Sequence, residues 1–283
     1  MFIELMQDAD KNEILSYMLP YEKFSVTLYS EILHGGKSIY VLRGNFGEIH
    51  GIFSWWQGSS IHHCLPEVYG KNRSEIESAF VKFFEENSIK YIFSISGEKS
   101  GTLMLKKILE NSFEKTPKVQ IEYFLMENGR FDSAKDLARM NRQLSVEKCG
   151  EQEISRVFPL QVEFEKEEVV LEPDLFNEDH CLAKFENFVD AGAVFVGKIK
   201  NAPLCKLTVS AQGKNYVLLG GVFTVPKYRN CGLAKALLNS VSQKFAAQSK
   251  KCTLFVKTEN KAAIKVYEKT GFKKFCNFEI LYY

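Results

Sequence analysis

The segment from Asn215 to Lys235 constrains the fold of this chain more than any other, because it joins a strand to a helix through glycines. Residues 216–224 are apolar and predict a strand. Gly220-Gly221 interrupts that strand, which indicates a bulge or a close backbone approach. The following helix has an apolar seam with a spacing of four: Leu233, Leu237, Val241 and Phe245. The segment therefore predicts a βα unit inside an α/β domain.

The turn between this strand and helix has the features of an anion site. A helix N-terminus offers backbone N–H groups that have no partner within the helix, beside the positive end of the helix dipole. Lys227, Arg229 and Lys235 add positive charge, Gly232 allows close backbone approach, and Ala234 is small. The turn therefore predicts a phosphate site, although a plain βα turn would share the strand–glycine–helix pattern.

A second group of landmarks lies on and around a short predicted helix, 261–269. Asn260 ends the preceding strand, Tyr267 lies on the helix, and Gly271 stands where a helix commonly ends in a left-handed glycine. Asn260 suits either a helix cap or a contact with a bound molecule.

Two motifs together carry a family resemblance: Gly221-Val222-Phe223-Thr224-x-Pro-x-x-Arg229-x-x-Gly232-x-Ala234, and Asn260-x-x-Ala263-x-x-x-Tyr267-x-x-x-Gly271-Phe272. The pair resembles the acetyl-CoA signature of the GCN5-related N-acetyltransferases (GNATs). The sequence departs from the pattern at Cys231, where Arg or Lys is usual. The resemblance implies an acetyl-CoA-dependent N-acetyltransferase, in which an amine attacks the thioester directly while both substrates are bound. Acetyl-CoA would be the acyl donor, and no metal is implied.

The resemblance also implies a set of residues that contact acetyl-CoA. The strand near Val222 would pair with the pantetheine arm, and the amides of the glycine turn would hold the pyrophosphate. The expected contacts are Val222, Phe223, Thr224, Arg229, Asn230, Cys231, Gly232, Leu233, Ala234, Asn260, Ala263 and Tyr267.

Direct transfer requires a donor for the developing oxyanion, a proton source for the thiolate and a deprotonated acceptor. The backbone N–H near Val222 suits the first role and the Tyr267 phenol the second. Glu167 and Glu168, on a helix predicted over 160–169, are the candidates for the base, and register does not choose between them. A solvated acidic face is the main alternative for these glutamates. A water relay with no dedicated base is also feasible.

Three other types of site are weaker. His62-His63-Cys64 lacks the spacing of a metal site, because adjacent residues on a strand point to opposite faces. Cys231 at a helix N-terminus would allow an acyl-cysteine route. A nucleotide-dependent oxidoreductase is disfavoured by the absence of a G-x-G-x-x-G pattern.

A regulatory protein that binds acetyl-CoA without turnover is the main alternative function. Release of CoA with candidate amines would separate this regulatory protein from an acetyltransferase.

The length of 283 residues favours two domains. Both halves show the order of two helices, a three-strand meander, helix, strand, helix and strand. We expect two acyl-CoA N-acyltransferase-like domains in tandem, each a mixed, mostly antiparallel sheet flanked by helices. Residues 1–126 would form a degenerate, non-catalytic copy, 127–141 a linker, and 142–283 the catalytic domain.

Composition limits the partners. Lys and Arg number 37 and Asp and Glu 35, so a surface built to coat nucleic acid or a membrane is not expected. Seven cysteines without a C-x-x-C pair, no secretory signal and no long apolar run predict a cytoplasmic protein. The expected partners are acetyl-CoA and an amine that the sequence does not identify, and a monomer and a homodimer are both open.

Overall fold

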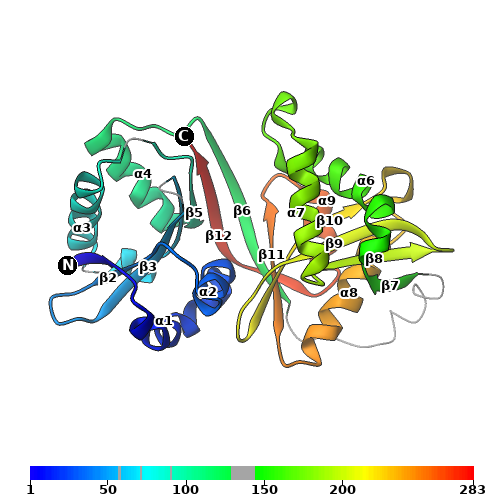
Figure 1. The fold of residues 1–283 in the computed structure, drawn as a ribbon, viewed down its shortest axis with the longest axis horizontal. Helices are drawn as coiled ribbons and strands as arrows, with labels where there is room; N and C mark the ends of the chain where they lie inside the picture. Colours follow the sequence, from blue (N-terminus) through cyan, green and yellow to red (C-terminus); the bar gives the residue numbers. More distant parts are fainter. Residues whose placement is uncertain (57–58, 71, 90, 129–143) are drawn as a thin grey trace. The chain divides into compact units, whose positions relative to one another are not determined.

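The computed structural model describes residues 1–56, 59–70, 72–89, 91–128 and 144–283. The chain divides into two compact units (Figure 1). Unit 1 comprises Met1–Met126, Phe255–Glu259 and Lys274–Tyr283, and unit 2 comprises Glu127–Leu254 and Asn260–Lys273.

Unit 1 is built on a mixed sheet with the strand order β1-β2-β3-β4-β5-β12-β6. Its strands are β1 (Phe2–Leu5), β2 (Ile39–Arg43), β3 (Ile49–Trp56), β4 (Ser60–Cys64), β5 (Ser94–Glu98), β6 (Val119–Asn128) and β12 (Phe272–Tyr282). The β4–β5 pair is parallel, whereas β1 to β4 pair antiparallel in sequence order and β12 pairs antiparallel with β5.

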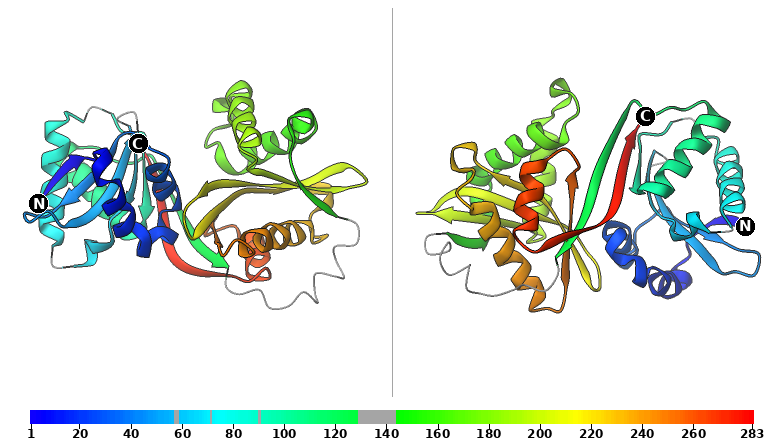
Figure 2. Two further views of the ribbon diagram at one scale, coloured as in Figure 1. Left: turned by 60° about the horizontal axis from the view of Figure 1, so that its bottom comes forward. Right: turned by 180° about the vertical axis from the view of Figure 1, so that it is seen from behind.

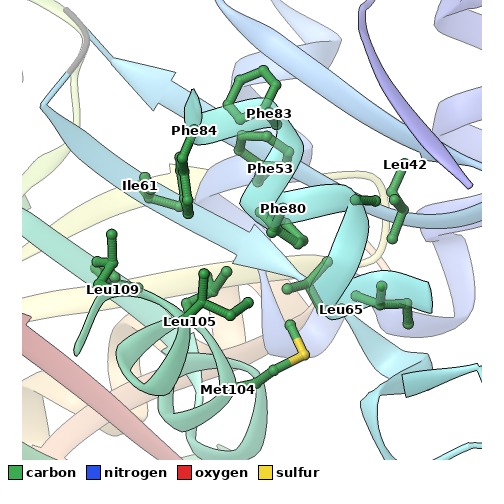
Figure 3. Close-up of a cluster of buried hydrophobic side chains, with 14 of the residues drawn as sticks. Leu42, Phe53, Ile61, Leu65, Phe80, Phe83, Phe84, Met104, Leu105 and Leu109 are labelled. Carbon is green, nitrogen blue, oxygen red and sulfur yellow. The ribbon is translucent and has the colours of Figure 1, made fainter. Parts of the chain in front are cut away.

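Alternation of side chains along the strands of unit 1 builds a core on each face of the sheet. Val41 and Ile52 join one cluster with α1 (Lys11–Met18) and α2 (Val26–Leu33). Leu42 and Phe53 join the other, with α3 (Arg73–Glu86) and α4 (Lys99–Phe113). Figure 3 shows Phe53 among Phe80, Phe83 and Phe84 of α3, with Met104, Leu105 and Leu109 of α4 nearby. The aromatic residues of the first half are therefore mainly core residues.

His63 of β4 packs closely against Thr102 and Gly97 in the interior of unit 1. Its ring is 2% exposed, and Nε2 lies 2.8 Å from the hydroxyl of Thr102. A Cβ added at Gly97 would come within 2.2 Å of this ring. The absence of a side chain at Gly97 is therefore what makes room for the histidine.

We expect Gly97→Ala to destabilise unit 1 by about 1–3 kcal/mol, because overpacking a closed site forces side chains or backbone to shift. Gly150→Ala is the matched control, since a Cβ there meets nothing within 4 Å. Urea unfolding of both variants measures the difference, and equal midpoints for Gly97→Ala and the wild type would contradict the expectation.

The strands of unit 2 lie in the order β11-β10-β9-β8-β7. Its strands are β7 (Ser145–Lys148), β8 (Val194–Ile199), β9 (Ala202–Gln212), β10 (Tyr216–Thr224) and β11 (Lys251–Lys257), of which β11 continues into unit 1 after Leu254. The β10–β11 pair is parallel and the others are antiparallel. One face is covered by α6 (Ile154–Phe164) and α7 (Glu178–Asp190), and the other by α8 (Leu233–Ala246), as Figure 2 shows. The last helix is α9 (Lys261–Glu268).

The expected fold class is confirmed: each unit has a mixed, mostly antiparallel sheet flanked by helices. The two units also repeat one order of elements. A meander of antiparallel strands leads to a parallel pair joined by a helix, which is β4-α3-β5 in unit 1 and β10-α8-β11 in unit 2.

Three features differ from the sequence-based expectation. The helix predicted over 160–169 begins earlier, at Ile154, with Pro159 inside α6, and residues 165–169 continue that helix as a π-helical segment. Residues 127–128 are the end of β6, and the rest of the expected linker lies outside the described residues. Residues 274–283, expected in the second domain, belong to unit 1, because β12 completes its ladder beside β5.

None of the helices in the described residues combines the length and the apolar character that crossing a bilayer requires.

Candidate active site

The predicted irregularity of strand β10 is a bulge. Gly220 pairs with Thr208 of β9 and Phe223 pairs with Lys206, so two residues of β10 face one residue of β9. Gly221 has φ +55°, a conformation that side chains rarely adopt. Within the described residues, the parallel register with β11 ends at Leu219. Pairing with β9 resumes at Phe223 and Thr224, so past the bulge the end of β10 keeps its β9 edge and lacks regular pairing on its β11 edge.

The predicted anion turn follows this released strand. A short 3-10 turn over Pro226–Tyr228 leads to Asn230, with φ 63°, and Gly232, with φ 78°. Gly232 is the N-cap of α8, a helix of 14 residues. Two left-handed residues so close together direct successive backbone N–H groups to one side, which is the geometry of an anion-binding concavity.

A cavity of about 620 Å³ opens between this turn, the bulged strand and α9, all within unit 2. Its volume falls in the range of sites for small organic molecules. The predicted residues that line it are Glu167, Glu168, Val222, Phe223, Thr224, Arg229, Asn230, Gly232, Leu233, Ala234, Asn260, Ala263 and Tyr267. Cys231 is exposed and is the one predicted contact outside this lining.

Asn260 serves as the cap of α9 and also contacts a glutamate. Its side-chain oxygen accepts a hydrogen bond from Ala263 N–H at 2.9 Å, and its Nδ2 donates to Glu168 Oε1 at 3.0 Å. The capping role that the sequence left open is therefore present, and the amide is turned toward Glu168 at the same time.

Tyr267 is buried at the floor of the cavity, with 8% of its surface exposed. Burial raises its pKa above the ordinary value of 10.0, and the nearby carboxylate of Glu168 raises it further. The phenol consequently keeps its proton at neutral and mildly alkaline pH and can act as a donor.

The two candidate glutamates have different surroundings although they are adjacent. Glu167 accepts a hydrogen bond from Arg229 Nη2 at 2.6 Å, and Arg229 Nε also donates to the Thr224 carbonyl at 3.1 Å. Glu168 lies instead beside Asn260 and Tyr267. Both residues line the cavity, and both lie on the π-helical segment that follows Phe164.

The sequence analysis missed two groups of residues near the cavity. Lys261 and Lys265 of α9 and Lys269 at its C-cap line it, and their spacing of four was the signal that could have revealed them. Lys206 of β9 is fully buried beneath the bulge, with Nζ 2.8 Å from the Gly221 carbonyl. A lone lysine in a strand gives no sequence signal of this contact.

The lining fits a molecule that carries phosphates at one end and polar, hydrogen-bonding groups along its length. The lysines and the anion turn provide positive charge for the phosphates. The buried hydroxyl of Thr224 has no hydrogen-bond partner among the described residues, so it has an unused hydrogen-bonding group beside the cavity. Over the same residues no group of three or more His, Cys, Asp or Glu is placed to hold a metal ion.

Comparisons with known proteins identify the fold. Residues 204–280 match the family model of FR47-like proteins. A GNAT acetyltransferase from Colwellia psychrerythraea is 14% identical with a TM-score of 0.60 and matches over 100% of both chains. A Drosophila protein is 11% identical with a TM-score of 0.66, covering 100% of this chain and 98% of that one.

A GCN5-related N-acetyltransferase from Sphaerobacter thermophilus is 10% identical with a TM-score of 0.57, and the match covers 99% of this chain and 94% of that one. No curated protein matches the sequence. The resemblance drawn from the sequence motifs is confirmed at the level of the fold.

Proposed function

Because the chain has the fold of the GCN5-related N-acetyltransferases, we propose that it transfers an acetyl group from acetyl-CoA to a primary amine. The observation that carries this proposal is the cavity of unit 2, where a strand bulge, an anion turn and a buried tyrosine meet. These features would supply what acyl transfer from a phosphate-bearing thioester requires: a site for the phosphates, a backbone donor for the oxyanion and a proton for the thiolate. Unit 1 lacks a glycine turn of this kind in its sequence and is proposed as the non-catalytic copy.

Acetyl-CoA would bind along the bulged strand and the anion turn. Val222, Phe223 and Thr224 would align the pantetheine arm, since the end of β10 is released from β11. The amides of Asn230 to Ala234 would hold the pyrophosphate at the start of α8. The lysines of α9 would hold further phosphate charge.

In the transfer step, the amine lone pair attacks the thioester carbonyl carbon, the C–N bond forms and the C–S bond breaks. The Val222 N–H would stabilise the developing oxyanion, and Tyr267 would give its proton to the departing thiolate. Glu168 would accept the amine's proton directly or through water, because Glu167 is engaged with Arg229. Tyr267 would regain its proton from solvent after product release.

The test combines binding and turnover. Calorimetric titration with acetyl-CoA is expected to give one site per chain. A panel of primary amines, including amino acids, polyamines, aminoglycosides and peptides, is then screened for release of the CoA thiol. At least one amine is expected to raise this release above the rate without acceptor. Binding of acetyl-CoA without release by any amine would favour a regulatory protein that senses acetyl-CoA, and two sites per chain would show that unit 1 also binds it.

A further inference from the structure

Lys206 is an unusual residue for the middle of a strand covered on both faces. It belongs to β9, is 0% exposed, and its ammonium lies 4.6 Å from the centre of the Phe164 ring. Taking a lysine out of water is costly unless its charge has partners. Its Nζ donates a hydrogen bond to the Gly221 carbonyl at 2.8 Å. The buried lysine is therefore directed at the bulge next to the proposed oxyanion donor.

The bulge explains why the Gly221 carbonyl needs a side-chain donor. Regular pairing of β10 with β9 is interrupted between Gly220 and Phe223, so the intervening peptide groups lose their ladder partners. A buried carbonyl without a partner is unfavourable. Lys206 supplies the missing hydrogen bond from the adjacent strand.

We infer that Lys206 is a positioning residue, which orients the Gly221–Val222 peptide so that the Val222 N–H faces the cavity; this inference rests on the proposed function. The C=O and N–H of a trans peptide point in opposite directions. Because Lys206 holds the carbonyl from the side of the sheet where Phe164 lies, we expect the N–H of the same peptide to be directed away from the lysine. Val222 lines the cavity.

The charge on Lys206 also strengthens the donor. A hydrogen bond from an ammonium polarises the carbonyl that accepts it, and polarisation of one end of a peptide group makes its N–H a better donor. Lys206 thus acts on the oxyanion through one peptide group, without touching the substrate. Glycine suits this position, since Gly221 has φ +55° and a Cβ there would lie 3.0 Å from the lysine Nζ.

The charge state of Lys206 changes near neutral pH. Burial lowers the pKa of the ammonium to about 7, while the carboxylate of Glu165 on the π-helical segment opposes this shift. The other titratable groups that face it are Cys181, which also opposes the shift, and Lys184, which adds to it; both lie on α7. Below pH 7 the lysine is charged, and the polarisation of the peptide is lost as pH rises through this value.

The first experiment needs no substrate. In protein labelled with ¹⁵N-valine, the Val222 amide resonance is expected to shift with a midpoint near pH 7. The shift should disappear in Lys206→Gln. The midpoint of the shift should move to lower pH in Glu165→Gln, because removal of the carboxylate makes protonation of the Lys206 amine less favourable. A Val222 resonance that titrates identically in wild type and Lys206→Gln would overturn the inference.

The second experiment measures rates. Lys206→Met removes the donor and is expected to lower kcat about tenfold or more, since loss of a direct oxyanion donor costs about 10²–10³-fold. The ratio of wild-type kcat to that of Lys206→Gln is expected to fall as pH rises through 7. Ionisation of the acceptor amine cancels in this ratio. Lys198→Gln is the matched control, because Lys198 is a buried lysine of the neighbouring strand paired with Glu147 and Glu153.

A flat wild-type to Lys206→Gln ratio, or the same pH dependence in the Lys198 control, would refute a role for Lys206 in the reaction. Failure of the proposed function would look different, since the wild type would then release no CoA with any amine at any pH. In that case the Val222 titration alone decides whether Lys206 controls this peptide.

Discussion

Replacing Gly232 with aspartate is expected to lower the affinity for acetyl-CoA at least about 100-fold. Gly232 is the N-cap of α8 and has φ 78° in the turn proposed to hold the pyrophosphate. An aspartate would place a carboxylate beside the bound diphosphate. Juxtaposed like charges cost several kcal/mol, and each 1.4 kcal/mol is about a tenfold change in affinity. Calorimetric titration with acetyl-CoA measures the loss.

Backbone strain alone would also weaken a variant at this position, and Gly271→Asp controls for it. Gly271 has φ +85° at the end of α9, and an added Cβ there meets nothing within 4 Å. Gly271→Asp should therefore have comparable strain but near wild-type affinity. Equal affinity in Gly232→Asp and the wild type would refute the assignment of the anion turn.

Tyr267→Phe is expected to lower kcat by about 10²–10⁴-fold, the usual contribution of a positioned general acid. The affinity for acetyl-CoA should change little, because the substitution removes one hydroxyl and keeps the buried ring. Burial and the Glu168 carboxylate raise the pKa of Tyr267 above 10.0, so the wild type should show no loss of rate from its deprotonation below about pH 10. Steady-state rates across the pH range measure both effects. A variant that turns over as fast as the wild type would show that Tyr267 is a packing residue and that water protonates the thiolate.

Local patterns in the sequence predicted most of the fold and most of the cavity lining. The apolar seam of α8, the glycines at 221 and 232 and the spacing from Asn260 to Tyr267 all depend on residues near each other in the chain. Such contacts follow from the periods of helices and strands. The sequence therefore indicated many of the residues that line the cavity of unit 2, and their roles in binding and catalysis stay predictions.

Contacts between distant residues could not be predicted in this way. Lys206 meets the bulge only because β9 lies beside β10 with a particular register, and one residue of slippage would turn its side chain to the other face. The π-helical segment at 165–169, which carries both glutamates that line the cavity, was likewise not predicted, since a regular helix was expected there.

The place of β12 in unit 1 has a consequence for synthesis of the protein. Residues Phe278–Tyr282 pair with β5, so a nascent chain that has emerged as far as Met126 has one edge of β5 uncovered. At about 5–20 residues per second, the ribosome adds the missing strand roughly 10–30 s later. Unpaired strand edges promote aggregation. The first unit to be synthesised is thus among the last to be completed, and one edge of β5 stays without its native partner during that interval.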